Sequence, residues 1–134
     1  MVKRSLRRDE RGMGAVEFAL IAPVFLSMLF GITQLGVLYF ANADLKNAVA
    51  AGAREASIYP RPSTSAITTK VNEKIVKLDK SKVTGPNITY GTDGNGFDWA
   101  QIQASYKVPL NFIFVTVSPV TLTETRRVYI QPAA

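Results

Sequence analysis

One uncharged stretch constrains this chain more than any other feature. Residues 18–40, FALIAPVFLSMLFGITQLGVLYF, carry no formal charge and end in Tyr39 and Phe40. A helix needs about twenty apolar residues to cross the hydrocarbon core of a membrane, which is about 30 Å thick. The stretch has this length, and an amphipathic tyrosine is typical of the headgroup region. We therefore expect a membrane-spanning helix over residues 13–40.

Positive charge is concentrated ahead of this stretch. The first twelve residues hold five basic and two acidic side chains, and the remaining 122 residues hold eleven basic and eight acidic ones. Each part has a net charge of +3, so the head is far more basic for its length. The positive-inside rule then predicts a cytoplasmic N-terminus and places the residues after Phe40 outside the cytoplasm. The mildly basic body argues against a nucleic-acid partner, which needs a basic face on the folded part.

The residue types that many catalytic and metal sites need are missing. The chain has no cysteine and no histidine, which excludes disulfides and removes the usual ligands of zinc and haem. No carboxylate pair, phosphate-binding loop or nucleophile–base set is recognisable, and an enzyme needs at least one of these. We therefore expect no enzymatic activity, no cofactor and no metal.

A glutamate stands at the entrance of the uncharged stretch. In the segment ERGMGAVEFAL, Glu17 directly precedes Phe18 and follows Gly12 by five positions. A carboxylate at the edge of lipid is costly, whether it stays charged or is neutralised. A plain single-pass anchor leaves both Glu17 and Gly12 unexplained. A cleaved signal peptide is disfavoured because its apolar core would be shorter.

A basic leader that ends in glycine, then four residues, a glutamate and an apolar helix is the arrangement of type IV pilin precursors. The segment RRDERGMGAVEFALIAPVFLSMLFGI resembles the start of TadE-type pseudopilins of the tight-adherence (Flp) pilus system, and the resemblance covers roughly residues 4–57. It implies that prepilin peptidase cuts after Gly12, so that the mature chain begins at Met13 with Glu17 as its fifth residue. Cleavage after Gly14 would leave the glutamate third, so we assign the site to Gly12.

The resemblance also implies a function. The chain would be a structural component, a minor pilin or pseudopilin that acts in assembly or initiation of a type IVb (Flp/Tad) pilus. Its partners would be prepilin peptidase, other pilin subunits through helix–helix packing, and the inner-membrane pilus assembly platform. It would lie in the bacterial inner membrane with its C-terminal domain periplasmic, or in the extracellular pilus after assembly. Two alternatives remain open: an anchored exoplasmic binding domain, and a pilin-like subunit of another type IV filament or secretion system.

Glu17, Phe18 and Pro23 are the residues that we assign to assembly. Cleavage would create a cationic amine on Met13, and opposite charges gain much more in an apolar core than in water. The amine of one subunit and the Glu17 carboxylate of its neighbour would therefore favour one axial stagger. Pro23 lacks an N–H and removes the hydrogen bond to the carbonyl of Ala19, so it is either a designed kink or a tolerated proline.

Helical character continues beyond the membrane. Residues 41–58 are alanine-rich and favour an amphipathic extension of the same helix, which would run to about residue 58 before Pro60 ends it. The residues expected on its apolar face are Leu45, Val49 and Ala53. With residues 1–12 as a basic leader, the remaining residues 59–134 would form a small exoplasmic α+β domain.

Periodicity predicts the elements of that domain. A second helix is expected over residues 64–78, and strands are expected at residues 83–91, with a turn inside, 99–110 and 120–132. Its buried helix face would comprise Ile67, Val71, Ile75 and Leu78, and the buried face of the second strand would comprise Ala100, Ile102, Ala104, Tyr106 and Val108. Residues 111–119 are expected to form a packed loop or a short strand. The expected fold is α+β and type IV pilin-like, with the long helix packed on a small antiparallel sheet.

Two polar motifs are given structural interpretations. The segment TDGNGFD, residues 92–98, offers oxygen ligands for calcium but fails the EF-hand pattern, so a hairpin turn is favoured. Arg126 and Arg127 could contact an anion, and a solvated strand face is the preferred interpretation.

Overall fold

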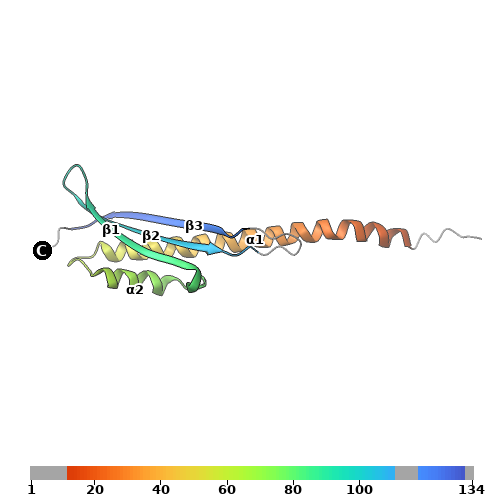
Figure 1. Cartoon of the computed structure of the whole chain (residues 1–134), viewed down its shortest axis with the longest axis horizontal. Coiled ribbons are helices and arrows are strands. Elements are labelled where there is room, and N and C mark those ends of the chain that lie inside the picture. Colours follow the sequence, from red (N-terminus) through yellow and green to blue (C-terminus); the bar gives the residue numbers. More distant parts are fainter. Residues whose placement is uncertain (1–11, 111–117, 132–134) are drawn as a thin grey trace, which may run out of the picture.

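The computed structural model of the chain describes residues 12–110 and 118–131. The elements in chain order are α1 (Met13–Ala56), α2 (Thr64–Lys74), the 3-10 helix η2 (Lys80–Lys82), β1 (Val83–Thr92), β2 (Asp98–Val108) and β3 (Val120–Tyr129). Figure 1 shows α1 as a long rod, with α2 and the sheet gathered around its C-terminal half. The predicted α+β fold, a long helix on a small antiparallel sheet, is confirmed. The predicted loop or strand at residues 111–119 lies mostly outside the described residues.

Helix α1 runs without interruption for 44 residues. Pro23 lies inside this helix and does not end it. The expected C-terminus near residue 58 is two residues too far, because the helix ends at Ala56 and Ser57 closes it. The Ser57 hydroxyl donates a hydrogen bond of 2.8 Å to the carbonyl of Arg54, which satisfies one of the carbonyls that a helix end leaves free.

Helix α2 is shorter than the sequence suggested. Ser63 caps its start by accepting a hydrogen bond of 3.2 Å from the amide of Ala66. The helix ends at Lys74 instead of residue 78, because Ile75 adopts an extended conformation. The four predicted buried residues, Ile67, Val71, Ile75 and Leu78, are nevertheless all buried. Tertiary packing therefore keeps the apolar face after helical geometry has ended.

The three strands form one antiparallel sheet in the order β1-β2-β3. The five residues predicted to face the core from β2 are all buried, which confirms the predicted alternation of buried and outward-facing residues along this strand. Strand β1 contains an irregularity between Thr84 and Asn87 where a turn was expected. Gly85 has a φ of +100° there, which favours glycine because a Cβ strains that conformation.

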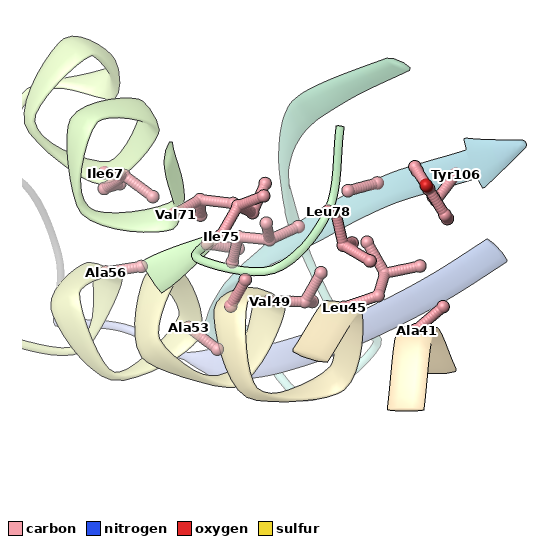
Figure 2. Packing of buried hydrophobic residues seen from close by; sticks show 14 of the residues in the cluster. Ala41, Leu45, Val49, Ala53, Ala56, Ile67, Val71, Ile75, Leu78 and Tyr106 are labelled. Carbon is pink, nitrogen blue, oxygen red and sulfur yellow. The ribbon is translucent and has the colours of Figure 1, made fainter. Parts of the chain in front are cut away.

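The core lies between the C-terminal half of α1, helix α2 and the inner face of the sheet. Figure 2 shows α1 contributing small and branched side chains toward Val71 and Ile75, which come from the opposite side of the cluster. The buried residues of α1 are Ala41, Leu45, Ala48, Val49, Gly52, Ala53 and Ala56. The first buried residue of α1, Ala41, therefore directly follows Phe40, the last residue of the uncharged stretch.

Candidate assembly interface

The N-terminal half of α1 has no packing partner in the described domain over most of its length. Its apolar side chains are largely exposed, with Phe18 and Leu20 each at 72%. The helix is long and apolar enough to cross a membrane, with a mean hydropathy of 2.1 over its most apolar 18 residues. A continuous apolar surface of this size on a protein marks a contact with lipid or with other protein. The exposed apolar side chains of this half are therefore suited to contact with lipid or with another protein.

The uncharged polar side chains of this half are largely satisfied within the helix itself. The Ser27 hydroxyl donates a hydrogen bond of 2.7 Å to the carbonyl of Pro23, and the Thr33 hydroxyl donates one of 2.9 Å to the carbonyl of Leu29. Such internal bonding is what an apolar solvent demands. Between Met13 and Phe40, Glu17 is the one residue with a formal charge. It is exposed, like its neighbours along the helix.

The start of α1 coincides with the predicted cleavage site. Met13 is the first helical residue and Gly12 occupies the N-cap position without a side-chain cap. A Cβ added at Gly12 or at Gly14 would meet no atom within 4 Å. Folding of the described residues therefore does not require glycine at either position, and any requirement for it comes from a partner.

Met13 and Glu17 lie one helical turn apart. Residues four positions apart share a face of an α-helix, and four residues rise about 6 Å along the axis. Phe18 is adjacent to this face, and Pro23 lies within the helix further along. The structure therefore places the five predicted site residues on one end of one helix, while their roles in cleavage and assembly stay predictions.

Comparison with known protein families bears on this same segment. The family model described as TadE-like protein matches residues 12–54. The N-terminal third of this chain is TadE-like. The match begins at Gly12 and covers nearly all of α1, and it leaves α2 and the sheet outside. No match to a curated protein or to a solved structure is found.

The TadE-like match confirms the resemblance predicted from the sequence. The match covers less than half of the chain, and it suggests a component associated with the Tad pilus. It also suggests that the partners of the chain are other pilus components. Together with the apolar half of α1, the match supports membrane anchoring.

The segment at residues 92–98 forms the turn of the β1–β2 hairpin. One carboxylate oxygen of Asp93 accepts hydrogen bonds of 2.9 Å from the amides of Asn95 and Phe97. The amide of Phe97, followed by that of Asn95, lowers the pKa of Asp93 against the cost of desolvation. Asp98 instead accepts a hydrogen bond of 2.8 Å from the Thr92 hydroxyl. Across residues 12–110 and 118–131, no group of three or more acidic side chains gathers as a metal site would require.

The two adjacent arginines of β3 point to opposite faces of the sheet, as neighbours in a strand must. The Arg127 guanidinium lies 4.0 Å from the centre of the Trp99 ring and donates a hydrogen bond of 3.1 Å to the Gln101 side chain. Arg127 is exposed, as the predicted solvated strand face requires, but the sequence does not reveal these contacts. Predicting these contacts requires the strand register, which pairs Gln101 with Arg127.

Proposed function

We propose that this chain is a minor pilin or pseudopilin that acts in assembly or initiation of a Tad pilus. The observation that carries the proposal is the division of α1 into two halves. One half packs on the small domain from Ala41 onward, and the other presents large apolar side chains without cover from the described domain. A subunit that must leave a bilayer and enter a bundle of parallel helices needs this division, because the same bare half serves both surroundings.

Processing is the second part of the proposal. Prepilin peptidase cuts between Gly12 and Met13 on the cytoplasmic side, and the C-terminal domain lies outside the cytoplasm. The basic head before the cleavage site supports this orientation through the positive-inside rule. The TadE-like match, which includes Gly12, Met13 and Glu17, supports the position of the cut.

The third part concerns Glu17, the charged residue in the N-terminal part of α1, residues 13–40, which we call the bare helix. The new amine of Met13 in one subunit pairs with the Glu17 carboxylate of the neighbouring subunit inside the helical bundle. A buried charge that loses its partner costs about 3–5 kcal/mol. The pair therefore permits one axial stagger and penalises the others, and an uncut chain has no amine to offer.

Mass analysis of the N-terminus tests this function directly. The full chain is produced in cells with a complete Tad system and in matched cells without prepilin peptidase, and it is purified from membranes and from sheared pili. We expect a chain that starts at Met13 when the peptidase is present and an uncut chain when it is absent. An uncut chain in piliated cells would instead favour an anchored exoplasmic domain that is never processed.

A further inference from the structure

Six lysines surround the end of the domain at which α1 enters its uncharged stretch. They lie on α1, at the end of α2, in and around η2, and at the end of β2. These residues, which we call the lysine collar, are Lys46, Lys74, Lys77, Lys80, Lys82 and Lys107. Each is exposed. Only Lys46 lies within ten residues of the apolar stretch along the chain, so the fold is what assembles the collar.

Specific contacts place the collar beside the start of the bare helix. The amide of Lys77 donates a hydrogen bond of 3.1 Å to the Asp44 carboxylate on α1. The Lys77 ammonium lies 5.9 Å from the centre of the Phe40 ring, the last residue of the uncharged stretch. In the sheet, Val83, which directly follows Lys82, pairs with Tyr106, next to Lys107. The chain segments that carry these lysines therefore converge on α1 near residues 40–46.

The collar accounts for most of the excess positive charge of the domain. Between residues 41 and 131 there are eleven basic and seven acidic side chains. Six of the basic side chains belong to the collar, and the acidic residues next to them are Asp44, Glu73 and Asp79, which gives a local net charge of +3. The other five basic and four acidic side chains leave a net charge of +1. In the part of the chain that the structure describes, Lys82 is the collar residue with an ion pair, to Asp79 at 3.3 Å.

Apolar side chains accompany the charge at this end. Val76 lies between two collar lysines in sequence and is 75% exposed. Leu110, three residues after Lys107, lines a shallow apolar depression together with Gly31, Leu35 and Leu38 of the bare helix. Exposed apolar groups flanked by lysines are typical of protein surfaces that lie on a membrane.

We propose that the lysine collar binds the headgroups of anionic phospholipids in the membrane that α1 spans, and holds the domain down on that surface. The inference rests on the membrane-spanning role of α1 in the proposed function. Asp44 is about 6 Å along the helix from Phe40, which is within the screening length of about 8 Å at physiological ionic strength. The collar is therefore close enough to interact with the lipid charge, and the remainder of the domain, with a net charge of +1, is attracted less.

This contact would act before assembly. A lysine stem can lie along apolar surface while its ammonium reaches phosphate, so the six side chains can adapt to a fluid layer of headgroups. Departure into a pilus separates the collar from lipid. The collar thus favours the membrane-bound subunit over the assembled one, and this preference weakens as salt screens the charges.

The test uses a fluorescent reporter at the collar of the full chain. The protein contains no cysteine, so Val76→Cys provides a single labelling site for an environment-sensitive dye. The labelled chain is reconstituted in vesicles of phosphatidylcholine alone or with phosphatidylglycerol, and both contain quenching lipids. We expect strong quenching of the dye in vesicles that contain phosphatidylglycerol. At about 1 M NaCl, where the screening length is about 3 Å, quenching should fall to the level in phosphatidylcholine vesicles. A Lys77→Gln/Lys80→Gln/Lys107→Gln variant should show the same low quenching without added salt.

A matched variant separates the collar from charge in general. Arg54→Gln/Lys70→Gln/Arg126→Gln removes three positive charges outside the collar and should keep the quenching of the parent. Equal quenching in both vesicle types, or equal losses in the two triple variants, would overturn the proposal. Resistance to carbonate extraction is measured on the same vesicles. If α1 does not span the bilayer, extraction succeeds for every variant, and the proposed function fails together with the collar's role.

Discussion

The carboxylate of Asp44 accepts a hydrogen bond of 3.1 Å from the backbone amide of Lys77, 33 residues later in the chain. This bond connects α1 to the loop that follows α2. Ile75 and Leu78, on either side of Lys77, are buried against the core. The bond therefore fixes the point at which the chain stops following helical geometry and turns toward β1.

Removing the Asp44 carboxylate should destabilise the domain. We expect Asp44→Ala to lower the free energy of unfolding by about 1–2 kcal/mol, since the amide of Lys77 loses a charged acceptor. Asp44→Asn should cost less, because its amide oxygen can still accept. Urea denaturation of the full chain in detergent, followed by Trp99 fluorescence, measures the change. Glu55→Ala, which removes a carboxylate of α1 with no side-chain partner in the described residues, should stay within about 0.5 kcal/mol of the parent; an equal loss there would refute the role of the bond.

Gly52 of α1 packs against Val71 of α2. A Cβ at Gly52 would overlap the Val71 side chain, so Gly52→Ala should overpack the core and cost about 1–3 kcal/mol. Gly36→Ala on the bare helix meets open space and should not destabilise the chain. The same urea titration measures both variants. Val71→Ala should recover stability in the Gly52→Ala background, and two strictly additive losses would show that the two residues do not compete for space.

Much of the fold could be predicted because the signals are local. The uncharged stretch, the alanine-rich extension and the alternation of β2 each specify one element through its own periodicity. The end of α2 could not be predicted in this way. Ile75 and Leu78 keep a helical spacing, but the Asp44–Lys77 bond and core packing move the chain out of the helix.

The candidate interface likewise contains residues that the sequence alone indicates and residues that only the folded chain brings together. Gly12, Met13 and Glu17 are assigned from the resemblance to pilin precursors, and their roles stay predictions; the TadE-like match covers that segment. The lysine collar could not be found from sequence, because its members are spread from Lys46 to Lys107 and come together only in the folded domain. The contacts of Arg127 could not be found for the same reason, since its partners Trp99 and Gln101 lie on another strand.

The β1–β2 turn should lose stability in acid. Backbone amides bind the ionised Asp93, so its pKa in the folded chain lies below the ordinary value. The stabilisation is therefore complete above the ordinary aspartate pKa of about 3.9 and is lost as the pH falls through the lower pKa of the folded state. A carboxyl-carbon NMR titration of Asp93 measures the pKa, and Asp93→Asn should remove this part of the pH dependence. A titration at or above the ordinary value would contradict the turn geometry.

Glycine at the cleavage site should matter to the peptidase and not to the fold. Gly12→Val should block cleavage, because a β-branched side chain prevents close passage of the backbone through an active site. It should leave the denaturation midpoint unchanged, since a Cβ at Gly12 has no neighbour within 4 Å. Gly14→Ala, in equally open space, should still be processed. Gel mobility and N-terminal mass distinguish the products, and cleavage of Gly12→Val with loss of cleavage in Gly14→Ala would move the site to Gly14.

Glu17 should be needed after insertion and cleavage. Glu17→Ala makes the bare helix more apolar and leaves Gly12 intact, so the chain should insert and be cut normally. Assembly should then fall by more than about a hundredfold, because a buried Met13 amine without a carboxylate costs several kcal/mol. Glu17→Gln should fail nearly as badly, since it keeps the shape without the charge, and Glu17→Asp should be intermediate because it is one methylene shorter. Co-purification of the processed chain with sheared pili, or the number of pili per cell, measures assembly. Parental levels with Glu17→Gln would show that the carboxylate does not pair with a neighbour and that Glu17 only occupies the headgroup region.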